Sequence, residues 1–137
     1  MLQRVGERVP EVGVASRARA EASLSFPPQQ VFAGVWVSEA GSRYLSDGDE
    51  FVCIAVHHPD FAGWVGKRAI AGITRVGDRW SALQAIRMAQ TGRLSEWVPV
   101  SLSIDSDLVT KFFSVNIPGQ LLVHGHVECY RRVYLQF

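Results

Sequence analysis

The sequence predicts an all-β protein: an eight-stranded antiparallel up-and-down barrel, preceded by an irregular or short-helical N-terminal arm. After residue 30, apolar segments of strand length alternate with turns that are rich in Gly, Pro and Asp. The turns are short, so consecutive strands pair as antiparallel neighbours. Eight such strands in a row leave two exposed edges, which closure into a barrel removes. A two-sheet sandwich is the alternative.

Length and composition limit the class of protein. The chain has 137 residues, enough for one domain, and 47% of them are hydrophobic, enough for a single core. The net charge is +1 and no basic stripe stands out, so we predict no nucleic-acid partner. No apolar run reaches the ~18 residues that a membrane helix needs, and none has signal-peptide character. We therefore expect a cytoplasmic protein without a membrane partner, in which Cys53 and Cys129 stay reduced.

The chain divides into an arm at residues 1–30 and a barrel domain at 31–137. Pro10 would interrupt a helix through the first valines, whereas 16–24 could form about two helical turns. The arm is either mobile or packs its valines on the barrel or on a neighbouring subunit. The predicted strands are 31–37, 43–45, 50–56, 67–76, 79–88, 94–104, 108–115 and 120–135.

The apolar pattern of period two predicts which strand faces are buried. Strand 50–56 is apolar on both faces, as is 31–37, so their outer faces need a cover. We therefore predict a homo-oligomer. Strand 79–88 is predicted to be half-exposed, with an inner face that consists of Trp80, Ala82, Gln84, Ile86 and Met88.

The first and last strands carry a family resemblance. Gly34-Val35-Trp36, the succession of short hairpins and Tyr130-Arg131-Arg132 together resemble the lipocalin-like (calycin) barrels, in particular their small bacterial members. The resemblance implies that Trp36 plugs the closed end of the barrel. It also implies that Arg131 or Arg132 packs across the indole, and that the interior can hold an apolar ligand.

Two segments carry the candidate chemistry. The loop from His57 to Gly66 is long for a hairpin and contains Phe61 and Trp64, so it is either a lid over the barrel mouth or a cap on the core. His124 and His126 share a strand face with Glu128, which is a metal-ligand spacing, and haem is a further possibility. That face is polar throughout, so we interpret it as solvent-facing and predict no metal and no cofactor.

The leading hypothesis is a barrel that binds a small, mostly apolar molecule and performs no chemistry. Gln84 is either a polar anchor for that molecule or a satisfied core group. An isomerase or lyase that uses His57 or Tyr130 as acid–base is one alternative. A structural or interaction protein with a side-chain-filled barrel is another. The predicted ligand-binding residues are Trp36, Phe61, Trp64, Trp80, Gln84, Ile86, Met88 and Arg87.

Overall fold

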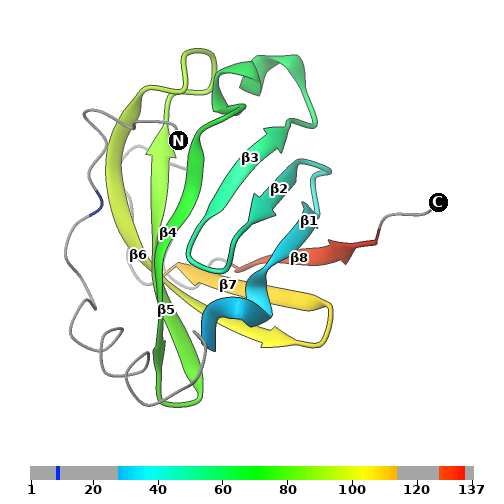
Figure 1. Cartoon of the computed structure of the whole chain (residues 1–137). Helices are drawn as coiled ribbons and strands as arrows, with labels where there is room; N and C mark the ends of the chain where they lie inside the picture. Colours follow the sequence, from blue (N-terminus) through cyan, green and yellow to red (C-terminus); the bar gives the residue numbers. More distant parts are fainter. Residues whose placement is uncertain (1–8, 10–27, 114–126, 135–137) are drawn as a thin grey trace.

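Eight antiparallel strands form a closed barrel in sequence order, which confirms the predicted fold class (Figure 1). In this computed structural model the described residues are 9, 28–113 and 127–134. The strands are β1 (Gly34–Ser38), β2 (Arg43–Ser46), β3 (Phe51–Ala55), β4 (Arg68–Val76), β5 (Arg79–Arg87), β6 (Leu94–Asp105), β7 (Leu108–Phe113) and β8 (Val127–Val133). Two short 3-10 helices accompany them, η1 (Pro28–Phe32) and η2 (Pro59–Trp64).

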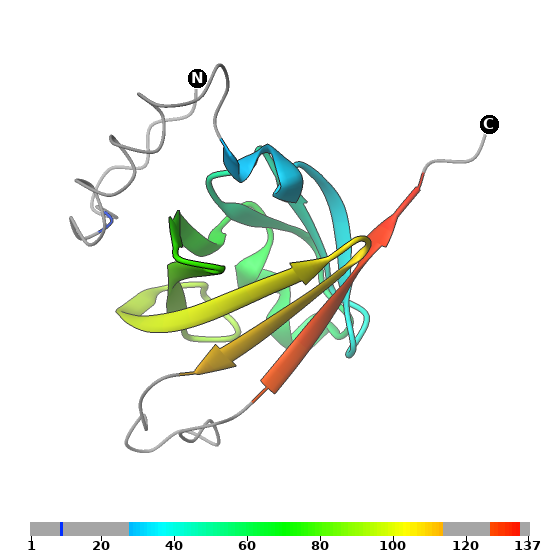
Figure 2. The same cartoon turned by 90° about the horizontal axis from the view of Figure 1, so that it is seen from below.

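The barrel closes through β1 and β8, the two strands farthest apart in the sequence. Trp36 pairs with Arg132 and Val37 with Arg131, while the other edge of β1 pairs with β2. Figure 2 shows β1 and β8 side by side. Within the described residues, each strand therefore pairs with a neighbour on both sides, as closure requires.

One end of the barrel is filled with aromatic side chains. The 3-10 turn η1 places Phe32 beside Trp80, with ring centroids 5.1 Å apart, and the Trp36 indole N–H donates to the Phe32 carbonyl oxygen at 2.8 Å. Phe51 stacks on Trp36 with a centroid separation of 6.2 Å. Trp36 is therefore a buried plug at the η1 end.

Arg132 packs against the Trp36 plug and binds the backbone around it. The Arg132 guanidinium lies 4.3 Å from the Trp36 ring centroid and donates to the carbonyl oxygens of Ala33 and Val31 at 2.7 and 2.9 Å. It also pairs with Asp107 at 3.0 Å. Arg131, the neighbour that the sequence could not distinguish from Arg132, points to the outside and is exposed.

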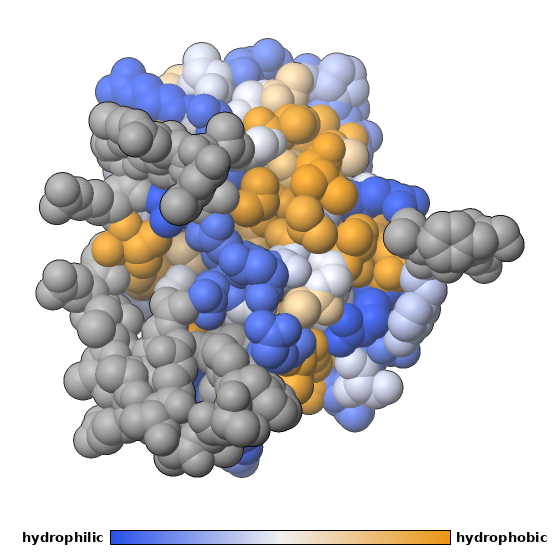
Figure 3. All heavy atoms as spheres, viewed as in Figure 1, coloured by the Kyte–Doolittle hydropathy of each residue, from blue (hydrophilic) through white to orange (hydrophobic). Residues whose placement is uncertain are grey.

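The outer face of β1–β3 carries exposed apolar side chains in the single chain, so the cover that the sequence predicts for this face stays a prediction. Ile54 is 42% exposed and Leu45 on β2 is 50% exposed, whereas Val35 and Val37 are half-buried. Figure 3 shows apolar surface over this part of the barrel. The homo-oligomer that would cover this face remains a prediction.

Strand β5 also departs from prediction, because it is buried on both faces rather than half-exposed. Leu83 and Ala85, on its outer side, are buried, and Ala85 lies opposite Trp97 of β6. The strand ends at Arg87, so Met88 belongs to the following turn and is 53% exposed. The prediction that Met88 faces the interior is therefore wrong: the alternation stops with the strand.

Little of the N-terminal arm belongs to the described residues, and the possible helix at 16–24 lies outside them. Val9 is half-buried, and its side chain lies near Gly72 of β4. Cys53 and Cys129 are both free. Within the described part of the chain, no helix has the length and apolar character needed to cross a membrane.

Candidate functional site

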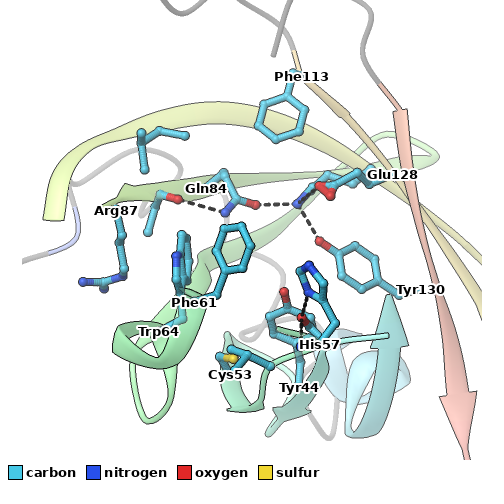
Figure 4. A pocket seen from close by; sticks show the side chains of 15 residues that line it. Tyr44, Cys53, His57, Phe61, Trp64, Gln84, Arg87, Phe113, Glu128 and Tyr130 are labelled. Carbon is cyan, nitrogen blue, oxygen red and sulfur yellow. Dashed lines mark hydrogen bonds and ion pairs between the residues drawn. The ribbon is translucent and has the colours of Figure 1, made fainter. Parts of the chain in front are cut away.

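A cavity of about 290 Å³ lies at the η2 end of the barrel, opposite the plugged end (Figure 4). This volume is at the small end of the range for ligand sites. Its walls come from β2, β3, β5, β7 and β8, with η2 across them. The barrel is thus filled at one end and hollow at the other. The lining residues are Ser42, Tyr44, Cys53, Val56, His57, Phe61, Trp64, Gln84, Ala85, Ile86, Arg87, Lys111, Phe113, Glu128 and Tyr130.

The helix η2 forms an aromatic cover over this cavity. Pro59 suits the first turn of a helix, and the His58 side chain caps it by accepting from the Asp60 backbone N–H at 3.0 Å. Phe61 and Trp64 of η2 line the cavity, and Phe61 lies 5.0 Å from the His57 ring. Trp64 also packs against the main core. The loop is therefore both a core cap and a cover for the cavity.

Two glycines, Gly63 and Gly92, let η2 lie directly against the β5–β6 turn. A Cβ atom on Gly63 would lie only 2.3–2.4 Å from backbone atoms of the β5–β6 turn, which are contributed by Gln90, Thr91 and Gly92. Gly92 has a φ of 73°, which glycine adopts without strain. Only residues without a side chain allow the cover to approach this turn so closely.

A buried row of polar groups crosses the floor of the cavity. The Lys111 Nζ lies 2.5 Å from Gln84 Oε1, 2.5 Å from the Tyr130 hydroxyl oxygen and 3.1 Å from a carboxylate oxygen of Glu128. The Gln84 Nε2 donates to the Ala85 carbonyl oxygen at 2.9 Å. Figure 4 shows this row above the rings of His57, Phe61 and Tyr130.

Strand alternation explains why a lysine is buried here. Val109, Lys111 and Phe113 share the inner face of β7, and Lys111 is the direct cross-strand partner of Glu128 on β8. Lys111 is only 2% exposed. Burial lowers the pKa of its ammonium group, while the charge of Glu128 and the hydrogen bond to it act in the opposite direction. The carboxylate at 3.1 Å favours the charged ammonium form.

The His57 imidazole is a second polar group, and it faces the floor of the cavity from the side of η2. The His57 Nδ1 lies 2.7 Å from the Ser42 Oγ, which also accepts from the His57 backbone N–H at 3.2 Å. Ser42 is buried, so this contact fixes the orientation of the ring. The other ring nitrogen faces the cavity (Figure 4).

The two tyrosines of the cavity are predicted to stay protonated well into the alkaline range. Burial raises the pKa of Tyr44, with Cys53 and Glu128 adding to the effect, and burial followed by Glu128 raises the pKa of Tyr130 strongly. An unfolded tyrosine ionises near pH 10, so above that pH the unfolded state gains stability that the folded state does not. The free energy of unfolding should therefore fall as the pH rises above about 10.

A spectrophotometric titration tests this expectation. In the native protein, Tyr44 and Tyr130 should form tyrosinate only as the chain unfolds. Tyr44→Phe should remove part of the alkaline loss of stability. Ordinary reversible ionisation of both groups near pH 10, with folding intact, would contradict the prediction.

Five of the eight predicted ligand-binding residues line the cavity: Phe61, Trp64, Gln84, Ile86 and Arg87. Trp36 and Trp80 lie in the filled end, and Met88 lies outside. Arg87 does not present its charge to the cavity. Its guanidinium donates to the carbonyl oxygens of Arg68 and Gly92 at 3.1 and 2.9 Å and points away from Lys111 (Figure 4).

Lys111 is the main residue that the sequence analysis missed. The sequence does contain a signal that Lys111 is buried, because this lysine lies between two apolar residues at spacing two on a short strand. The interpretation of the strand face that carries Glu128 as solvent-facing is wrong, because Tyr130, two residues further along the same face, is 2% exposed and points inward. The polar groups on this face instead pair with Lys111 on the adjacent strand.

The proposed histidine pair at His124 and His126 lies outside the described residues. Among the residues that the structure describes, no three His, Cys, Asp or Glu side chains gather as a metal site would require. No protein-family model, curated protein or solved structure matches this chain. What the structure itself defines is a class: a closed eight-stranded up-and-down barrel, plugged at one end, with a covered cavity at the other.

Proposed function

We propose that this protein binds a small, mostly apolar molecule in the η2-end cavity of a lipocalin-like barrel. The observation that carries the proposal is the cavity itself: aromatic walls formed by Phe61, Trp64 and Phe113, with a few polar groups gathered at the floor. Ligand sites commonly combine a mostly apolar lining with a few such placed polar groups. The plug of Trp36 and Arg132 supports the lipocalin-like assignment, which stays part of the proposal.

Binding can be tested with 2-ethylnaphthalene as an apolar probe, followed by calorimetry and by the four tryptophan indole NMR signals. Trp64 lines the cavity, whereas Trp36 and Trp80 lie at the filled end and Trp97 is on β6. We expect binding with a shift confined mainly to the Trp64 signal. Ile86→Phe, which adds volume inside the cavity, should weaken binding at least tenfold, while Val76→Phe at an exposed site should not.

Failure of the probe to bind, or equal shifts of all four indole signals, would count against this proposal. The Val76 variant is a matched control, since Val76 is 56% exposed at the end of β4. A folded Ile86 variant that binds normally would place the ligand elsewhere.

An isomerase or lyase in the same barrel is the second candidate, favoured by one observation. His57 and Tyr130, from distant parts of the chain, line the same cavity, and Ser42 orients the imidazole. Such a pair could remove a proton next to a carbonyl group and hydrogen-bond the carbonyl oxygen. An enzyme of this type should accelerate deuterium exchange into the methyl group of 2-acetylnaphthalene, and His57→Gln should abolish the acceleration. A pure binding protein should show no acceleration.

A further inference from the structure

The hydrogen bonds of Lys111 determine which hydrogen bonds the neighbouring Tyr130 hydroxyl can still make. An ammonium group has three N–H donors, and three acceptors surround the Lys111 Nζ: Gln84 Oε1, the Tyr130 hydroxyl oxygen and the Glu128 carboxylate. The amide and carboxylate oxygens can only accept, so the lysine donates to both. As an ammonium it also donates to the tyrosine oxygen, and all of its donors are used within the protein.

Tyr130 therefore keeps its own O–H for another partner. Among the described residues, Lys111 is the hydrogen-bond partner of this hydroxyl, and it occupies the oxygen rather than the hydrogen. A cationic donor on the oxygen polarises the phenol, which strengthens the O–H as a donor. Because Tyr130 lines the cavity, this hydrogen is available to a bound molecule.

The charges around the floor disfavour an anion. The positive charge of Lys111 is already paired with Glu128, which also lines the cavity and would repel a second carboxylate. Arg87 directs its guanidinium to backbone carbonyl oxygens. An anion bound here would lose its hydration, and among the residues that the structure describes Lys111 and Arg87 already direct their charges to other partners.

We infer that the natural ligand is an uncharged molecule with an apolar body and a carbonyl oxygen, which accepts a hydrogen bond from the Tyr130 hydroxyl. This inference rests on the proposed binding function and names the class of its ligand. The apolar body lies against Phe61 and Trp64 under the cover, and the oxygen lies at the floor beside the lysine.

Three probes that share a naphthalene ring and differ in the substituent at position 2 test the inference: 2-acetylnaphthalene, 2-ethylnaphthalene and 2-naphthoate. We expect the ketone to bind about tenfold more tightly than the hydrocarbon, which corresponds to one well-formed hydrogen bond, and more tightly than the carboxylate. The infrared carbonyl stretch of the bound ketone should move to lower frequency than in an apolar solvent.

Tyr130→Phe should remove the preference for the ketone and the infrared shift, while the hydrocarbon binds as before. The matched control is Tyr134→Phe, which removes the hydroxyl of an exposed tyrosine outside the cavity lining and should leave both the preference and the shift unchanged. The infrared shift is measured in the unmodified protein, so the test does not depend on the folding of a variant.

The outcomes separate the two proposals. If none of the three probes binds, the proposed function fails. If the hydrocarbon binds as tightly as the ketone, or the carboxylate binds most tightly, the inference is overturned while binding in the cavity stands. A carbonyl stretch that does not shift also overturns it.

Discussion

Lys111→Met is expected to lower the free energy of unfolding by about 2–4 kcal/mol. Methionine fills a similar volume but makes none of the hydrogen bonds of the ammonium group. Gln84 Oε1 and the Tyr130 oxygen would lose a partner in a buried site, and each buried polar group left unpaired costs about 1–3 kcal/mol. Glu128 is 37% exposed at its side chain, so water would compensate for part of its lost ion pair. Urea denaturation measures the change.

The control for this prediction is the chain's other lysine. Lys67 is half-buried directly before β4, and Lys67→Met should change the free energy of unfolding by less than about 0.5 kcal/mol. The double variant Gln84→Leu with Lys111→Met should recover part of the loss, because no amide oxygen remains unpaired. A single Lys111 variant as stable as the parent would show that the row contributes nothing to the fold.

Gly63→Ala is expected to displace the cover from the cavity. The new methyl group would lie 2.3–2.4 Å from three backbone atoms of the β5–β6 turn, which cannot yield as a flexible side chain would. We expect η2 to move outward, with a loss of about 1–3 kcal/mol in stability. Amide hydrogen exchange in η2 should become faster, and a bound probe such as 2-acetylnaphthalene should dissociate at least tenfold faster.

Gly66→Ala is the matched variant in the same loop. Gly66 has a φ of 82°, but a Cβ atom there would meet nothing within 4 Å. This variant therefore carries the strain of a left-handed backbone without the collision. If both variants release the probe at the same rate, the glycine contact does not hold the cover in place.

Most of the fold could be predicted from sequence because strands and tight turns are local features. The alternation around residues 79–87 and the Gly77-Asp78 turn mark β5 and its hairpin without reference to the rest of the chain. Closure followed from a general argument about free edges. The errors arose where burial depends on neighbours in space: Met88 beyond the end of β5, and Leu83 and Ala85 on an outer face of β5 that is buried.

The site was predictable only in part. Phe61 and Trp64 stood out because a long aromatic loop is unusual in a chain of short hairpins. Gln84 stood out as a polar residue on an apolar strand face. Lys111 did not, because it was judged against its own strand, and its role depends on lying beside Glu128 and Tyr130 across β7 and β8.

The sequence by itself determined the fold class and the arrangement of eight strands, since hydrophobic period and turn chemistry act over a few residues. The aromatic plug was what the lipocalin-like resemblance implied. The sequence left open which arginine covers Trp36 and whether the barrel is hollow. The tertiary structure decided both. Strand register selects Arg132, and closure brings Gln84, Lys111, Glu128 and Tyr130 from three strands into one hydrogen-bonded row. Such a row depends on distances across the barrel, which no local pattern in the chain records.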